Sequence, residues 1–543
     1  MRSKSLLLLP LALSSFVAVS AAQGSPYAAA VVNYNPGAGY APGYTNVSAV
    51  IGQPASSGID PFDPAYETNQ ILSIGAGGSV TVEFDRPIVH YPNGNRDFII
   101  FGNSFLEAGN YFDPPDVWAA NGEVINDGGA TRVSVSADGV AFYTLNPALA
   151  PTVNDLYPTD GAGDFRKPVN PGLNPARFAG LTLSNISMFY DGSAGGASYN
   201  IAWAQDTNGN AADLRAIRYV RVDVLTNSAQ VAGFAAVEGT ALAEDFSNNP
   251  AADGWQAFGD ANLFTWQPAG QEMHVTWDST KPNSFYFHPL GTVLTSNDAF
   301  SLSFDLLLTG ADTNEDGTNA LELGIGFLNL AGAENPNFLI GTGENATNLA
   351  EFEFYPAAGE YGGLPSLDAT LIDTNGYYYF AYDDIPWGFG MFYHVTITHA
   401  AGTSALTGQI LANGQLYSTL PGGFSEGTGD FRLDAVSINS YSDAGTAALD
   451  FPSSITADGF VKNMFVTAPP PPVTYLSGAF TNNAWQAQFW SRTNWNYTLE
   501  KSANLQTWLS LGPAAAGTGG PLALQDTNTP GPSVFYRVSA SPQ

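Results

Sequence analysis

Cysteine is missing from this chain of 543 residues. Its absence excludes a disulfide framework, a thiolate metal site and a cysteine nucleophile. Basic residues are scarce as well, because 17 Lys and Arg stand against 49 Asp and Glu. The net charge of −32 repels phosphate backbones and anionic lipid, which disfavours nucleic acid and membrane surfaces as partners. Motifs for serine-nucleophile, zinc or nucleotide chemistry are also lacking, since no G-x-S-x-G, H-E-x-x-H or P-loop pattern occurs.

Long apolar runs are lacking too, apart from residues 6–19, which are too few to span a bilayer permanently. Arg2 and Lys4 precede this run, and the small residues Ser20, Ala21 and Ala22 follow it. A basic start, a short apolar stretch and small residues are the three parts of a secretory signal peptide. We therefore expect residues 1–22 to be removed, with cleavage after Ala21 or Ala22. The mature protein is expected outside the cell or at its surface, without a membrane span.

Glycine, proline and aromatic residues are abundant, with 58 Gly, 36 Pro and 13% aromatics. This composition predicts many short strands joined by tight turns, hence an all-β chain. Its length exceeds one hydrophobic core. A strand-like run ends near residue 240 and a new segment begins there, and a polyproline spacer lies at 468–473. These two boundaries divide the chain into domains over 23–240, 241–467 and 474–543. We expect two tandem β-sandwich (jelly-roll) domains followed by a small C-terminal β-sandwich module.

Period-two alternation of apolar and polar residues places individual strands. Residues 80–84, 300–306, 350–354 and 392–398 alternate in this way. Residues 132–145 are expected to form a hairpin that turns at Asp138-Gly139.

The same segments carry a resemblance to known families. The first domain resembles a discoidin-like β-sandwich of exported bacterial surface proteins over residues 72–79, 97–105, 136–143 and 213–222. The second is similar to a concanavalin/laminin-G-like jelly roll over 277–279, 304–305 and 351–356, and the third to a short C-terminal β-module over 497–500, 505–508 and 535–538. The resemblance implies the fold; such sandwiches serve as lectins, adhesins and hydrolases alike.

Two oxygen-rich turns are candidate calcium sites. Asp312, Asn314 and Asp316 match the first half of a calcium loop, followed by a glycine where the chain must turn. Asp206 and Asn208 form a shorter turn of the same kind. In the alternative, both are ordinary solvated turns of an acidic protein. Calcium is thus a possible cofactor.

Two further groups are candidates for work on carbohydrate. Glu351 and Glu353 lie two apart on a predicted strand, so they share a face at about 6–7 Å, near the separation of glycosidase carboxylates. In the alternative, they are the polar face opposite Phe352 and Phe354.

The loop at residues 382–390 offers an indole for stacking on sugar and two carboxylates for its hydroxyl groups: Trp387, Asp383 and Asp384. In the alternative, Trp387 packs into the core.

These observations favour a secreted or cell-surface, non-catalytic protein that binds extracellular polysaccharide or cell-surface glycan and serves in adhesion. A polysaccharide hydrolase of concanavalin-like fold, using Glu351 and Glu353, and a purely structural envelope component are the competing hypotheses.

The first prediction concerns the N-terminus. Secreted material is expected to begin at Ala22 or Gln23, because the apolar stretch is followed directly by small residues. N-terminal sequencing of the exported protein measures this, and a retained Met1 would contradict it.

Overall fold

The computed structural model describes residues 25–90, 96–126, 128–153, 157–313, 321–339, 346–356, 363–444, 454–481, 484–527 and 534–543. The predicted signal peptide lies outside these ranges. Antiparallel strands dominate, and the described part contains only two short α-helices, α1 (Leu183–Phe189) and α2 (Leu330–Ala333). The predicted all-β class with tandem sandwiches is therefore confirmed. Neither of these helices has the length and apolar character needed to cross a membrane.

The first sandwich is built from two antiparallel sheets. One has the order β1 (Ala30–Asn35), β3 (Ser79–Val89), β11 (Ala216–Val224), β7 (Thr131–Ser136), β8 (Tyr143–Leu145), β10 (Ala204–Gln205). The other has the order β2 (Leu72–Gly75), β12 (Ser228–Ala236), β4 (Phe98–Gly102), β9 (Ala197–Tyr199), and β5 (Phe105–Ala108) pairs with β6 (Ala120–Ile125) apart from both. Val80, Val82 and Phe84 are fully buried between the sheets, as the alternation of this segment predicts.

The second sandwich also consists of two sheets. The β18 sheet has the order β15 (Phe264–Gln267), β16 (Glu272–Asp278), β28 (Ile455–Ala468), β18 (Phe300–Thr313), β23 (Tyr393–His399), β24 (Leu406–Ala412), β25 (Gln415–Ser418), with β13 (Thr240–Glu244) also on β28. The β20 sheet has the order β14 (Gln256–Phe258), β17 (Ser284–Leu294), β27 (Leu433–Ser440), β19 (Leu323–Leu328), β20 (Leu349–Tyr355), β21 (Ser366–Ile372), β22 (Tyr378–Asp384), β26 (Phe424–Ser425). One large apolar core lies between them.

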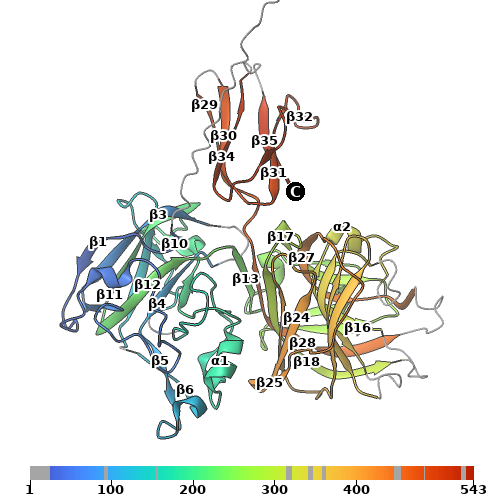
Figure 1. Cartoon of the computed structure of the whole chain (residues 1–543), viewed down its shortest axis with the longest axis horizontal. Coiled ribbons are helices and arrows are strands. Elements are labelled where there is room, and N and C mark those ends of the chain that lie inside the picture. The colour runs from blue at the N-terminus through green and yellow to red at the C-terminus, as the bar shows by residue number, and fades with distance from the viewer. Residues whose placement is uncertain are drawn as a thin grey trace, which may run out of the picture.

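The C-terminal module packs two small sheets around Phe489, Trp495 and Tyr497. One contains β29 (Val473–Thr481), β30 (Ala484–Ser491) and β34 (Pro521–Asp526). The other contains β31 (Trp495–Ser502), β32 (Leu509–Ser510), β33 (Ala515–Ala516) and β35 (Phe535–Pro542). In Figure 1 the two large sandwiches lie side by side and the C-terminal module stands above their junction.

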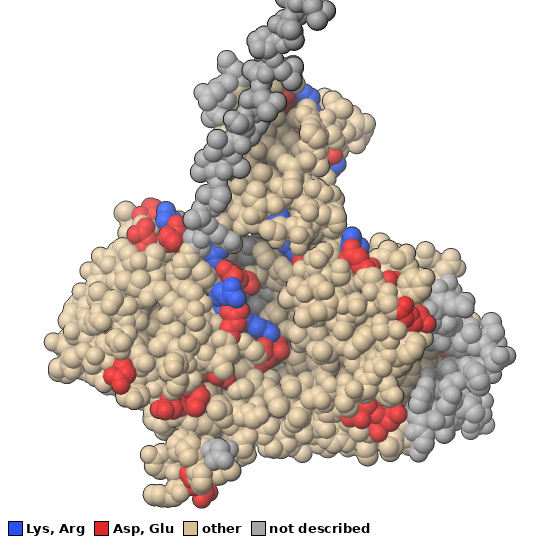
Figure 2. Space-filling view, viewed as in Figure 1, with Lys and Arg blue, Asp and Glu red and all other residues tan. Residues whose placement is uncertain are grey.

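Several of the few basic residues lie at this junction. Figure 2 shows basic and acidic side chains together in the groove beneath the C-terminal module. Arg86 and Arg166 both pair with Glu238 at 2.7 Å, and Lys167 pairs with Asp191 at 2.7 Å. The Lys167 ammonium also lies 3.3 Å from the Ser301 hydroxyl of the second sandwich, so part of the scarce positive charge joins the sandwiches.

The polyproline spacer is held against the protein rather than standing free. The Arg492 guanidinium donates to the Pro470 carbonyl at 3.1 Å and forms an ion pair with Asp298 of the second sandwich. The Tyr497 hydroxyl donates to the Pro472 carbonyl at 2.7 Å. Side chains of the C-terminal module thus fold back onto the spacer.

Removing this clamp is predicted to expose the spacer. Arg492→Met should speed cleavage within residues 469–472 several-fold, since the variant loses both the ion pair and the carbonyl contact, and accessible linkers are cut first. A time course of limited proteolysis, followed by mass spectrometry of the C-terminal fragment, measures the rate. Arg537→Met is the matched control, because Arg537 pairs with Glu500 inside the module. Equal rates in wild type and Arg492→Met would contradict the clamp.

Candidate functional site

The outer face of the β20 sheet carries the predicted pair of glutamates. Ala350, Phe352 and Phe354 alternate into the core, so Glu351 and Glu353 must point to the opposite face. The register places Glu351 opposite Thr370 and Glu353 opposite Asp368 on β21. Strand alternation therefore brings acidic side chains from neighbouring strands onto one surface.

Both glutamates are buried and hydrogen bonded. Glu351 accepts from the Tyr441 hydroxyl and the Asn439 amide, each at 2.6 Å. Glu353 accepts from the Thr370 hydroxyl at 2.6 Å and the Tyr355 hydroxyl at 3.2 Å. The exposed fractions of Glu351 and Glu353 are 0% and 2%. Neither carboxyl group is open to a substrate.

Glycine in β19 makes room for the Glu351 side chain. A Cβ on Gly324 would lie 2.1 Å from Glu351 Oε2, which is far inside contact distance. Glu322, just before β19, is buried as well, and both of its carboxyl oxygens lack a hydrogen-bond donor in the described part of the chain. The face thus holds four buried acids, Glu322, Glu351, Glu353 and Asp368, which we call the acid cluster.

Burial and mutual repulsion raise the pKa of every carboxyl group in this cluster. Burial raises the pKa of Glu322 to about 8, and the nearby Glu351 and Asp368 add to the rise. The pKa values of Glu351 and Glu353 are raised well above the usual range, again chiefly by burial. Burial raises the pKa of Asp368 to about 7. A carboxyl group that keeps its proton near neutral pH has the property of a general acid, but a general acid must also reach its substrate.

An aromatic strip lies beside the acid cluster on the same face. Tyr378, Phe380 and Tyr382 alternate outward along β22, and Phe424 joins them from β26. The ring centres of Tyr378 and Phe380 are 5.9 Å apart, and those of Phe380 and Phe424 are 5.8 Å apart. Phe424 is 49% exposed, and the other three side chains are half-buried. These four residues form the aromatic strip, a continuous surface of rings that is open to solvent.

The predicted sugar-binding loop is not assembled as expected. The Trp387 indole is only 7% exposed, stacks on Tyr393 at a centroid distance of 3.8 Å and contacts Phe354 edge-on at 5.5 Å. Asp383 points toward the other sheet, where it accepts from the Ser418 hydroxyl at 2.6 Å. Trp387 therefore belongs to the core, which is the alternative that the sequence left open, because burial of the large indole is favourable.

Asp384 is the predicted sugar-binding residue that faces the acid cluster. It pairs with Ser366 in the sheet register, shares the outer face of β22 with Tyr382 and helps to raise the pKa of Asp368. Its Oδ1 atom is buried without a hydrogen-bond donor among the residues that the structure describes.

Only some of the predicted calcium ligands are among the described residues. Asp312 lies near the end of β18, whereas Asn314 and Asp316 lie outside the described residues. Asp206 accepts from the backbone N–H groups of Asn208 and Asn210 at 2.8 and 2.9 Å, so the carboxylate closes its own turn. The Asn210 side-chain amide and these backbone bonds lower its pKa. Within the described ranges no three His, Asp or Glu side chains are grouped to hold a metal ion. Calcium at residues 312–316 stays a prediction.

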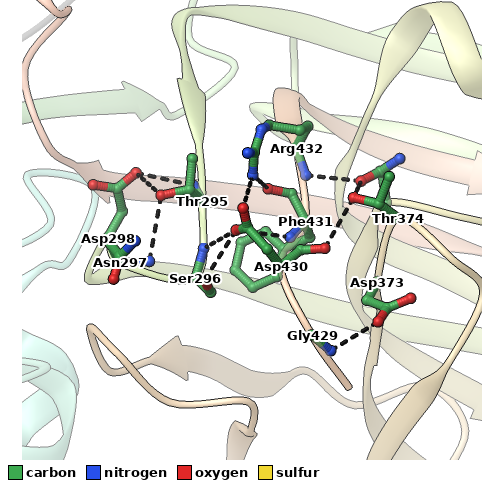
Figure 3. Close-up of polar contacts among 11 residues, drawn as sticks. Thr295, Ser296, Asn297, Asp298, Asp373, Thr374, Gly429, Asp430, Phe431 and Arg432 are labelled. Carbon is green, nitrogen blue, oxygen red and sulfur yellow. Dashed lines mark hydrogen bonds and ion pairs between the residues drawn. The ribbon is translucent and has the colours of Figure 1, made fainter. Parts of the chain in front are cut away.

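Other acidic residues hold loops together in the same way. Figure 3 shows Asp430 accepting from the Ser296 backbone and hydroxyl at 3.0 and 2.9 Å, while Thr374 binds the Asp430 carbonyl at 2.9 Å. Asp298 closes a neighbouring turn by accepting from the Thr295 backbone at 2.9 Å. Acidic side chains of the second sandwich such as these therefore stabilise turns.

Comparison with known proteins gives only a distant likeness. No protein-family model and no curated protein matches the sequence. Among solved structures, the alginate lyase Aly36B is 13% identical, with a TM-score of 0.26, over 42% of this chain and 96% of that one. The lectin UEA-II in complex with galactose is 13% identical, with a TM-score of 0.26, over 43% and 99%. The β-glucanase of Bacillus licheniformis is 10% identical, with a TM-score of 0.22, over 41% and 97%. The neighbours are thus both lectins and enzymes.

The acid cluster predicts a particular pH dependence of stability. The pKa of Glu322 is near 4.5 when exposed and about 8 when buried. Between these values the unfolded chain has lost the proton that the folded chain keeps, so stability falls as pH rises from about 5 to 8. Glu322→Gln should flatten this fall. Melting temperatures across this pH range measure it, with Glu334→Gln as the control because Glu334 is exposed. An unchanged slope in Glu322→Gln would contradict the assignment.

Proposed function

We propose that this chain is a secreted or cell-surface protein that binds neutral polysaccharide on the aromatic strip without cleaving it. The observation that carries the proposal is the open row of rings formed by Tyr378, Phe380, Tyr382 and Phe424. Sugar rings have apolar C–H faces that pack on aromatic faces, and binding sites combine such surfaces with a few polar groups.

Polar groups for sugar hydroxyls lie next to the strip. The phenol groups of Tyr378 and Tyr382 belong to the strip itself, and Asp384 shares the outer face of β22 with them. The rings stand on consecutive outward positions of one strand, so the strand fixes their spacing. A rigid surface of this kind loses little conformational freedom when a ligand binds.

Charge favours a neutral ligand at this surface. Residues 241–467 contain 27 acidic and 3 basic residues. The negative field of the second sandwich disfavours acidic glycans at a strip that carries no basic side chain of its own. Neutral glycans avoid this repulsion.

The buried state of the glutamates favours binding over hydrolysis. Glycoside hydrolysis needs two carboxyl groups that flank the scissile bond. Glu351 and Glu353 are spaced as such a pair would be. However, both accept hydrogen bonds from neighbouring strands, and neither is exposed to solvent. The raised pKa of each is the one feature that favours the competing hydrolase.

The proposal predicts that removal of rings weakens binding. Phe380→Ala combined with Phe424→Ala should lower the affinity for a neutral β-glucan at least tenfold, because the central rings of the strip are lost. Affinity gel electrophoresis measures this, with circular dichroism to verify the fold. Phe112→Ala is the control, since it removes a fully exposed ring from the first sandwich.

Two outcomes would contradict the proposal. Undiminished binding by the double variant would exclude the strip as the site. If the wild type released reducing sugar and Glu353→Gln did not, the protein would be a hydrolase.

A further inference from the structure

A pocket lies between the first sandwich and the outer face of the β18 sheet. In Figure 1, α1 of the first sandwich faces β25 and the neighbouring strands of the second. The pocket has a volume of about 650 Å³, and both sandwiches contribute to its walls. Its polar lining includes Arg177, Asp305, His394, Lys462 and Asn463.

Three of these residues form a row across neighbouring strands. Asp305 on β18 stands opposite His394 on β23 and opposite Lys462 on β28. Residues directly opposite in antiparallel strands have Cβ atoms about 5 Å apart and share a face. A base, an acid and an imidazole are thus placed side by side on a surface that faces the first sandwich.

Asp305 is fully occupied by donors. It is completely buried and accepts from Arg177 at 2.7 Å, from His394 Nδ1 at 2.8 Å and from the Asn463 amide at 2.7 Å. These contacts hold its pKa well below the usual range in spite of burial. Asp305 is therefore ionised, and its charge is balanced by Arg177 from the first sandwich.

The row leaves two groups available for a ligand. His394 Nδ1 is bound to Asp305, which leaves Nε2 as the ring nitrogen for a ligand. His394 is only 2% exposed, yet it lines the pocket, and its Nε2 atom has no hydrogen-bond partner in the described part of the chain. Lys462 lies with its ammonium 3.7 Å above the Phe392 ring, and no carboxylate of the described residues is within ion-pair distance of it.

Positive charge is scarce in this sandwich. Only Lys281, Arg432 and Lys462 are basic among residues 241–467, and Arg432 is bound to Asp430. In the pocket, Arg177 and Lys462 outnumber the single acid Asp305. The pocket therefore has a local positive excess inside a strongly acidic protein, and a local charge acts more strongly than a distant field that salt screens.

The remaining lining fits a hydroxylated ring. Asn174, Gln271 and Asn413 provide amides that both donate and accept, and Phe189 and Phe392 provide aromatic walls.

We propose that this pocket binds an acidic saccharide, a uronate, with its carboxylate at Lys462 and a hydroxyl group hydrogen bonded to His394 Nε2. Neither a neutral sugar nor a simple anion uses both groups. This site differs from the aromatic strip in sheet, in charge and in ligand class, so it does not depend on the proposed function.

Calorimetry with an oligogalacturonate in 0.15 M salt tests the proposal on the mature full chain. Wild type should bind, and Lys462→Met should bind at least tenfold more weakly. Lys281→Met is the matched control, because it removes an exposed lysine of the same sandwich. Lys462→Arg should retain most of the affinity, since it keeps the charge. The Phe380→Ala, Phe424→Ala double variant should bind the uronate unchanged.

Three results would overturn the proposal. They are the absence of uronate binding by wild type, equal binding by wild type and Lys462→Met, and equally strong binding of a neutral oligosaccharide of the same length. Displacement of the uronate by an equal concentration of acetate would identify a simple anion site and would also overturn it.

Discussion

This structure depends on one constraint: some of its strands are buried on both faces, so their polar side chains are buried as well. In β20 every second residue enters the core, so Glu351 and Glu353 must be placed on the outer face, and in β18 the same rule places Asp305 there. Buried carboxyl groups are costly unless they find donors or keep their protons. The two sheets meet this cost in different ways. On the β20 sheet the acids stay protonated, whereas on the β18 sheet Arg177, His394 and Asn463 stabilise the ionised Asp305.

Basic residues are scarce, and two of them join domains through ion pairs. Arg177 joins the first sandwich to Asp305, and Arg492 joins the C-terminal module to Asp298. Both arginines bind a carboxylate that is almost fully buried, where removal of one partner leaves an unpaired charge. The large acidic surplus elsewhere is consistent with carboxylates that close turns, as Asp206 and Asp430 do.

Much of the fold could be predicted from the sequence because alternation is a local signal. Residues 80–84, 300–306 and 350–354 alternate clearly, and each lies within a strand of the structure. The composition likewise predicted the all-β class. The pairing of strands could not be predicted in this way, because paired residues such as Asp305 on β18 and Lys462 on β28 lie far apart in the sequence.

The candidate site was predicted less well, for a physical reason. Trp387 was expected as a stacking platform because it stands in a Gly- and Pro-rich segment, yet its indole fills the space beside Tyr393 and Phe354. The aromatic strip begins just before that segment and includes its first residue, Tyr382. Residues 377–380 are all aromatic, so the sequence does not mark which of these rings face outward. Phe424 is separated from them by more than forty positions and joins them only through the pairing of β26 with β22.

The central claim is that the outer face of β22 binds sugar, and a crystal structure with a neutral oligosaccharide tests it most directly. The account predicts sugar rings stacked over Phe380 and Phe424, with hydroxyl groups near Tyr382 and Asp384, and an intact glycosidic chain. An oligosaccharide bound elsewhere with the strip bare, or a cleaved chain beside Glu353, would contradict it.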